Sequence, residues 1–432
     1  MKKIRIGLLG LGTVGSGVYR LIEKNREIIQ KKAGIDIHIY KAADRRAEAG
    51  KALGVPDGVF TRSAADVIED PEVDLVVELI GGTTEARELM LSALRRRKHV
   101  VTANKALLAE HGREIVREAL ANRVELGFEG SVCGGIPIIK TIREALIGNR
   151  IERIIGIVNG TTNFILTKMT KEGLGFSDAL RQAQELGFAE ADPTLDISGG
   201  DARHKITILS SLAFKTPVDM SLVYVEGIDR IDRKDIQYAG EFGFVLKLLA
   251  IAERFDEGVL VKVHPALVSK ENPLAAINWE DNAVVVYSDF LGKSMYSGKG
   301  AGSHPTASAV VADITDIALR HGGGSYNESS YTFYEKLAQL KFEESRTRYY
   351  FRFHVLDRPG ILSRIAGVLG NCNISIASVI QKESEEEREH VPLVMLTHTA
   401  LEADVNRAVS QIDRFPEVEG ASKIIRVFEE SR

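Results

Sequence analysis

The first 130 residues alternate apolar runs with amphipathic segments, which is the pattern of parallel strands joined by helices. The apolar runs predict strands at residues 3–9, 36–43, 74–79 and 98–102. Between the first two runs, apolar residues recur at the three- and four-residue spacing of one helical face. We therefore expect an α/β fold whose first domain, residues 1–130, is built around a parallel sheet.

Residues 131–320 continue the alternation and predict a second, α+β domain. An apolar run indicates a strand at 151–158, and a polar turn is expected at 160–163 before another helix. A short helix follows, with Ser177 as its N-terminal cap and Gly187 as its left-handed stop.

The last part of the chain has a different order of elements. Residues 321–348 contain three consecutive glycines, serines and a charged segment, which predict a linker between domains. Residues 349–432 read strand, helix, strand, strand, helix, strand, and this is the ferredoxin-like order. The charged run at 383–389 predicts a solvated hairpin between the two central strands.

Composition excludes several classes of protein. A chain of 432 residues exceeds what one core usually supports, so two or three domains are expected. A net charge of −4 provides no basic surface for nucleic acid, and no stretch approaches the length of a membrane span. Cys133 and Cys372 stand far apart and do not predict a disulfide framework, which favours a cytoplasmic protein.

A glycine fingerprint follows the first predicted strand and opens the first helix. Gly10 permits a tight turn, Gly12 lets the backbone approach a pyrophosphate, and Gly15 allows the helix to pack closely. Thr13 and Val14 start the helix, whose free N–H groups and positive dipole end suit phosphate oxygens. The first domain is therefore predicted to be a Rossmann-type dinucleotide-binding domain.

The end of the second strand carries both kinds of ribose-reading residue. An acid here, Asp44, bonds the 2′-hydroxyl of NAD, whereas an arginine accommodates the 2′-phosphate of NADP. Because Arg45 and Arg46 follow at once, NADP is the expected cofactor, with NAD possible.

Polar turns at the ends of the later strands add further cofactor candidates. Ligands in such sheets lie beyond the carboxyl ends of the strands, so Thr83, Thr102 and Lys105 are expected to face the cofactor. Lys105 could instead simply open the next helix, although a lysine suits a first helical turn poorly. A helix at 303–320 is expected to return to the first domain, which would bring Gly302 to the cofactor.

An acidic stretch between residues 183 and 205 holds the strongest candidate chemistry. It contains Glu190, Asp192, Asp196 and Asp201, and Lys205 lies one helical turn beyond Asp201 on the same face. One interpretation is a solvated acidic loop with a surface ion pair. The sharper one is a site that binds an ammonium group and moves a proton.

The same stretch carries a resemblance to a known family. Its match to the signature of the homoserine dehydrogenases covers Ala183, Gly187, Phe188, Ala189, Asp192, Pro193, Asp196, Ile197, Gly199, Asp201 and Lys205. The resemblance spans about residues 1–320, and residues 349–432 resemble the regulatory ACT domain often attached to this enzyme. It implies NAD(P)-linked interconversion of L-homoserine and L-aspartate 4-semialdehyde, on the pathway to threonine and methionine.

The resemblance also implies roles for particular residues. Lys205 would be the acid/base and Lys105 a second essential lysine. Glu190 and Asp201 would bind the substrate, with Asp196 and Gly187 beside them.

It further implies a sodium ion in the loop that contains Glu129, Val132, Gly134 and Ile136, since a hard cation prefers oxygen ligands. Together with the turn at 357–362, it implies feedback by L-threonine at the ACT domain. A homodimer or homotetramer formed through the middle of the chain is also expected.

Two other functions remain open at the level of sequence. An aldehyde-oxidising semialdehyde dehydrogenase would use Cys133 as a thiolate nucleophile, although a free cysteine is more often buried and inert. A non-catalytic redox sensor would bind nucleotide and an amino acid without turnover, and would not need Lys205.

Overall fold

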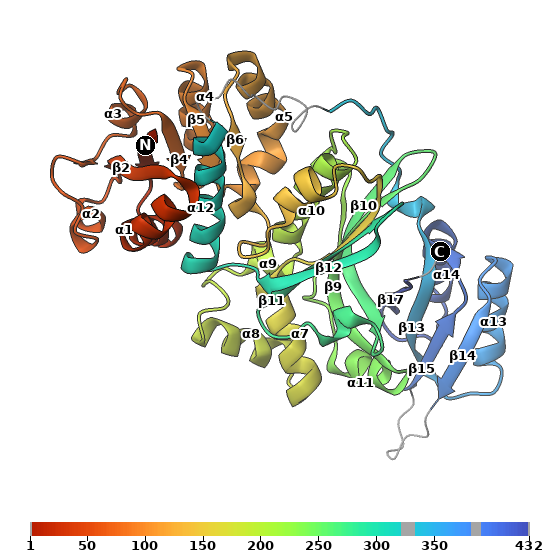
Figure 1. Ribbon diagram of the computed structural model, residues 1–432. Helices are drawn as coiled ribbons and strands as arrows, with labels where there is room; N and C mark the ends of the chain where they lie inside the picture. The colour runs from red at the N-terminus through yellow and green to blue at the C-terminus, as the bar shows by residue number, and fades with distance from the viewer. Residues whose placement is uncertain (1, 321–332, 382–389, 431–432) are drawn as a thin grey trace.

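The computed structural model describes residues 2–320, 333–381 and 390–430. The predicted glycine connector at 322–324 and the predicted hairpin at 383–389 lie outside these residues. Figure 1 shows the N-terminal domain at one end of the molecule, a mixed α/β domain in the middle and the C-terminal domain at the other end. Within the described part of the chain, no helix has both the length and the apolar character to cross a membrane.

The N-terminal domain is a doubly wound parallel sheet, as predicted. Its strands lie in the order β3-β2-β1-β4-β5-β6, so the chain reverses direction across the sheet between β1 and β4. The strands are β1 Lys2–Leu9, β2 Ile35–Ala43, β3 Phe60–Thr61, β4 Leu75–Glu78, β5 His99–Thr102 and β6 Leu126–Gly127. Its helices are α1 Thr13–Ala33, α2 Ala47–Ala52, α3 Ala64–Ile68, α4 Glu85–Arg95 and α5 Lys105–Asn122.

Helix α12, Ser303–Arg320, confirms the expected return to this domain. Figure 1 shows it, in teal, beside the N-terminal sheet, whose strands are distant from it in sequence. Its buried side chains, among them Val310 and Ile314, share one apolar core with the strands and with Val18 and Ile22 of α1. Gly17 of α1 lies so close that a Cβ there would stand 2.5 Å from the Ser303 hydroxyl.

The middle domain places helices against a large antiparallel sheet. Its strands are β7 Ile151–Ile157, β8 Tyr224–Val225, β9 Phe244–Arg254, β10 Val259–Ser269, β11 Asp281–Ser288 and β12 Gly292–Lys299. Its helices are α6 Ile138–Lys140, α7 Gly160–Glu172, α8 Phe176–Glu185, α9 Thr194–Ile197, α10 Gly200–Ala213 and α11 Arg233–Glu241.

Two local predictions for this domain were wrong. Residues 160–163 are not a turn but the first turn of α7, because the Asn159 side chain accepts the Thr162 N–H at 2.8 Å and caps the helix. Helix α8 is capped by Gly175 instead of Ser177, and the earlier start lets Phe176 pack on the core. Gly187, with φ +77°, does follow the end of α8 as the predicted left-handed residue.

The C-terminal domain has the predicted ferredoxin-like order. Its elements are β13 Arg346–Leu356, α13 Ile361–Asn371, β14 Ile376–Gln381, β15 His390–Thr397, β16 Ala400–Leu401, α14 Glu402–Ile412 and β17 Lys423–Phe428. Strand β17 pairs in parallel with β10 of the middle domain, where Ala266 lies opposite Arg426. The two domains therefore share one eleven-stranded sheet, in which nine strands follow the order β12-β11-β7-β9-β10-β17-β13-β15-β14, while β8 pairs with β10 and β16 with β13.

Candidate active site

The glycine fingerprint adopts the geometry that a dinucleotide needs. Gly10 has φ +91°, and a Cβ at Gly15 would stand 1.9 Å from the Gly10 carbonyl oxygen, so α1 packs directly on the turn. A Cβ at Gly12 would meet nothing within 4 Å, which leaves the backbone open on the ligand side. The glycines border a cleft of about 710 Å³ at the carboxyl ends of the strands, large enough for part of a dinucleotide.

Charged residues lie along this cleft near the end of β2. The Asp44 carboxylate accepts the Leu11 N–H at 2.8 Å and so holds the glycine turn against β2. Arg45 is exposed and pairs with Glu85 at 2.7 Å. Arg62, which the sequence did not single out, also lines the cleft and donates to the Arg45 carbonyl oxygen.

Glu78, at the end of β4, holds the ends of neighbouring strands together through its hydrogen bonds. The sequence pattern did not single it out. It is fully buried and accepts the backbone N–H groups of Ile80 and Gly81. It also accepts the Thr102 hydroxyl at 2.7 Å, and the Thr102 side chain is buried, so its contact with a cofactor stays a prediction. Thr83, in the neighbouring turn, is half-buried, and its contact with a cofactor stays a prediction.

Two lysines from different domains meet at one buried carboxylate. Lys105 opens α5 in the N-terminal domain, and its Nζ lies 3.0 Å from Asp201 Oδ1. Lys205, one turn after Asp201 on α10, donates to Asp201 Oδ2 at 2.8 Å and to the Val158 carbonyl oxygen at 2.6 Å. Lys105 is 38 % exposed and Lys205 only 8 %, so the two ammonium groups stand at different depths.

The opposite charges in this cluster stabilise one another. Burial raises the pKa of the Asp201 carboxyl, but Lys205 and Lys105 outweigh that effect and hold the pKa well below its usual range. Burial likewise lowers the pKa of Lys205, and the Asp201 carboxylate more than reverses it. Lys205 is therefore an ammonium group at neutral pH, which the sequence alone left undecided.

Asn159 links the two carboxylates of the acidic stretch. Its Nδ2 donates to Asp196 Oδ1 at 2.7 Å and to Asp201 Oδ2 at 2.8 Å, while its Oδ1 caps α7. The Thr161 hydroxyl donates to Asp196 Oδ2 at 3.0 Å. An asparagine after an apolar strand is a cap signal, and this signal could have singled out Asn159.

Glu190 is not brought into this cluster. It is exposed on the loop between α8 and α9, and its carboxylate makes no hydrogen bond or ion pair with the described residues. Gly187 lies at the start of the same loop. Their roles as substrate ligands stay predictions.

The loop with the expected cation ligands uses its carboxylate differently. Both Glu129 oxygens accept backbone N–H groups, from Ile139 at 2.8 Å and Lys140 at 2.7 Å. Burial and the neighbouring Asp313 raise the pKa of Glu129 to about 7. Among residues 2–320, 333–381 and 390–430, no three His, Cys, Asp or Glu side chains are placed to hold a metal ion. A cation site formed by Glu129, Val132, Gly134 and Ile136 stays a prediction.

Cys133, in the same loop, does not have the surroundings of a nucleophile. It is fully buried, and burial raises the pKa of its thiol, which disfavours the thiolate. Its Sγ lies 3.6 Å from the amide nitrogen of Asn282.

The loop before α12 closes the nucleotide side of the site. Ser303, the first residue of α12, donates its hydroxyl to the Thr13 carbonyl oxygen at 2.7 Å. Gly302, with φ +115°, precedes it and therefore stands next to the glycine turn. Contact of Gly302, Thr13 and Val14 with a cofactor stays a prediction.

Three family models match the chain in order. Residues 10–129 match the NAD binding domain of homoserine dehydrogenase, and residues 137–315 match homoserine dehydrogenase itself. Residues 349–417 match the ACT domain.

Similar proteins extend this match to the whole chain. A homoserine dehydrogenase of Pseudomonas aeruginosa is 42% identical over 432 residues, with 99% of each chain covered. A crystal structure of a homoserine dehydrogenase from Thiobacillus denitrificans is 44% identical, with a TM-score of 0.94 and 99% of each chain covered. A hyperthermophilic archaeal homoserine dehydrogenase in complex with NADPH is 30% identical, with a TM-score of 0.63, and the match covers 74% of this chain and 98% of that one. The chain therefore belongs to the homoserine dehydrogenases, NAD(P)-dependent oxidoreductases that act on a CH–OH group.

Proposed function

We propose that Lys205, assisted by Lys105, carries the proton in the interconversion of L-homoserine and L-aspartate 4-semialdehyde. The observation that carries this proposal is the meeting of two ammonium groups at Asp201, one from each domain, beside the dinucleotide fold. The bound nicotinamide supplies the hydride chemistry. What the chain itself must supply is orientation of the alcohol and a group that takes or gives its proton.

The geometry suits the reductive direction directly. Two of the three Lys205 N–H donors are taken by Asp201 and the Val158 carbonyl oxygen, which leaves one for a substrate oxygen. As an ammonium group it polarises the aldehyde and then protonates the nascent alkoxide. In the oxidative direction the proton returns to this nitrogen, and Asp201 steadies the ammonium that forms.

The acidic loop beside the cluster is the proposed place for the substrate's own ammonium group. Asp196 accepts hydrogen bonds from the neutral groups of Asn159 and Thr161 and forms no close ion pair with the described residues. Glu190 is exposed and has no described partner for its carboxylate. Either carboxylate would attract a substrate ammonium, and Gly187 leaves space beside them.

NADP is the proposed preferred cofactor. Arg45, Arg46 and Arg62 all line the adenosine end of the cleft, which suits a ligand with an additional phosphate. The archaeal relative in complex with NADPH supports this choice.

Replacing Arg45 and Arg62 together with alanine should raise the KM for NADP by about tenfold and leave the KM for NAD nearly unchanged, because only NADP carries the 2′-phosphate. Initial rates of L-homoserine oxidation with each cofactor measure this, and wild-type turnover in the same assay tests the proposed reaction. Arg87→Ala is the control, since Arg87 pairs with Glu114 on α5 and does not line the cleft. Equal losses with both cofactors would contradict the assignment.

L-Threonine is the proposed effector of the C-terminal domain, at the turn before α13 where Gly360 has φ +96°. Contacts between the C-terminal domain and the loop before the active-site helices support communication between the two. Arg426 of β17 binds Glu402 at 2.6 Å and also pairs with Glu226 of the middle domain. Two residues after Glu226, the Ile228 N–H donates at 2.8 Å to the carbonyl oxygen of Ile197, in the helix that carries Asp196.

Glu226→Gln should raise the L-threonine concentration for half-inhibition at least fivefold while threonine-free turnover is retained, because the variant loses the charge that Arg426 holds. The measurement is inhibition of homoserine oxidation by threonine. Asp232→Asn is the matched control. It removes the exposed ion pair between Asp232 and Arg352, which also joins these two domains but does not contact α9. Equal sensitivity of wild type and Glu226→Gln would refute this route, and a wild type that ignores threonine would refute the effector itself.

Two expectations from the resemblance have less support. No step of the proposed mechanism depends on a sodium ion, and both oxygens of the Glu129 carboxylate already accept backbone N–H groups of α6. A homodimer or homotetramer stays a prediction. The outermost strands of the large sheet, β12 and β14, are the edges on which a second copy could pair.

A further inference from the structure

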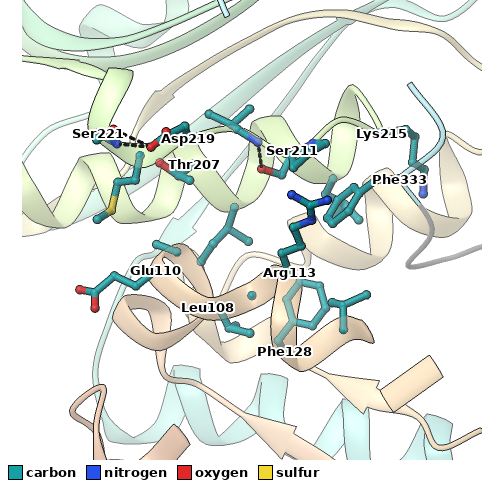
Figure 2. A pocket seen from close by; sticks show the side chains of 18 residues that line it. Leu108, Glu110, Arg113, Phe128, Thr207, Ser211, Lys215, Asp219, Ser221 and Phe333 are labelled. Carbon is teal, nitrogen blue, oxygen red and sulfur yellow. Dashed lines mark hydrogen bonds between the residues drawn. The ribbon is translucent and has the colours of Figure 1, made fainter. Parts of the chain in front are cut away.

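A cavity of about 530 Å³ lies between α5 and α10, outside the cluster of charged residues described above. Figure 2 shows it from close by, with residues of α5 below and of α10 above. Residues of its lining share the faces of α5 and α10 that carry Lys105 and Lys205. Leu108 and Gly112 follow Lys105 at spacings of three and seven residues, and Ile208 and Leu212 follow Lys205 in the same way. The Lys105–Asp201 ion pair joins the same two helices that line this cavity.

The lining combines an apolar floor with hydroxyl groups and cations. The apolar side chains include Leu108, Val116, Phe128, Ile208 and Leu212, and the hydroxyl groups belong to Thr207 and Ser211. A ligand that fits must therefore have a sizeable apolar body.

Arg113 is the group at the rim that suits an anion. Arg113 makes no hydrogen bond or ion pair with the residues that the structure describes, and Figure 2 shows its guanidinium between the two helices, beside Phe333. Lys215 adds a second cation to the lining. Of the two carboxylates there, Asp219 already accepts the Ser221 N–H and hydroxyl, and Glu110 lies 3.9 Å from His111.

Gly112 gives an independent reason to regard the cavity as a specific feature of the fold and not as a packing defect. It stands near the middle of α5, where glycine is less favourable than alanine for a helix. Packing does not require it, because a Cβ there would meet nothing within 4 Å and φ is not positive. The missing side chain keeps the cavity open.

We propose that this cavity is a regulatory binding site for an amphipathic anion, a molecule with a flat apolar body and a carboxylate or sulfonate group that pairs with Arg113. The apolar body lies between α5 and α10, and the anion lies at the rim. Because α5 carries Lys105 and α10 carries Asp201, a ligand that wedges these helices apart separates the two groups and slows turnover. The binding itself does not depend on the proposed function.

The test uses 8-anilinonaphthalene-1-sulfonate as the probe, with the full chain and saturating NADP so that the dinucleotide cleft is filled. Fluorescence titration should show one saturable site per chain. Gly112→Leu, which fills the cavity, should weaken binding at least tenfold, and Arg113→Met should weaken it roughly fivefold. Gly112→Ala is the matched control for the helix and should bind within about twofold of wild type.

Turnover supplies the second readout. The probe should inhibit homoserine oxidation without competing with homoserine, and Gly112→Leu should be resistant by the same factor by which its binding weakens. Absence of a saturable site in the wild type, or equal binding by the wild type, Gly112→Leu and Arg113→Met, would overturn the proposal. Saturable binding lost in these variants but without any inhibition would refute the regulatory role.

Discussion

Replacing Lys205 with methionine should lower kcat for L-homoserine oxidation by about 10³-fold and leave the affinity for NADP unchanged. Methionine keeps much of the length of the side chain but cannot accept or donate the proton. The fold should survive, because Asp201 keeps Lys105 and Asn159 as partners. Steady-state kinetics and nucleotide titration on the same preparation measure the two quantities.

Lys262→Met is the control for this loss. Lys262 is as deeply buried as Lys205 and also pairs with a carboxylate, Glu253 at 3.3 Å, but it lies on β10 outside the cluster. The Lys262→Met variant should be less stable than the wild type but should show no comparable loss of kcat. Near-normal turnover by Lys205→Met would remove Lys205 from the mechanism and favour the nucleotide-sensor interpretation.

Asp201→Asn should be damaging both to turnover and to stability. The variant removes the negative charge beside the buried Lys205 ammonium, and breaking a buried ion pair on one side costs about 3 kcal/mol. It also frees Lys105, so kcat should fall by about 10²-fold or more. Denaturant unfolding and steady-state kinetics measure the two effects.

Asp196→Asn is the matched control within the same acidic stretch. Its carboxylate is less buried and bonds only neutral donors, so the variant should lose about 1 kcal/mol of stability. An equal loss of stability in the two variants would show that the buried ion pair is not what distinguishes Asp201.

The parts of the fold and site that could be predicted are those that depend on residues close together in the sequence. Gly10, Gly12 and Gly15 lie within six residues, and each has a local backbone reason. Asp201 and Lys205 are one helical turn apart, so their pairing follows from helix geometry. The strand order of the C-terminal domain followed from its alternating pattern in the same way.

The rest depends on contacts between distant segments. Nothing near Lys105 in the sequence shows that it meets Asp201, 96 residues later, and the family resemblance was needed to connect them. The pairing of β10 with β17 joins segments more than 150 residues apart, so the pattern of neither strand predicts it. The contacts of Glu129 with the start of α6 are likewise not visible in the residues next to it in the sequence.

The most direct test of the central claim is the pH dependence of L-aspartate 4-semialdehyde reduction with NADPH, in the wild type and in Asp201→Asn. Asp201 raises the pKa of Lys205 against the lowering effect of burial. Without the carboxylate, the ammonium should lose its proton at lower pH, and the alkaline fall in rate should move down by at least about one pH unit. An alkaline limb at the same pH in both enzymes would contradict the claim that Asp201 holds Lys205 as the proton donor.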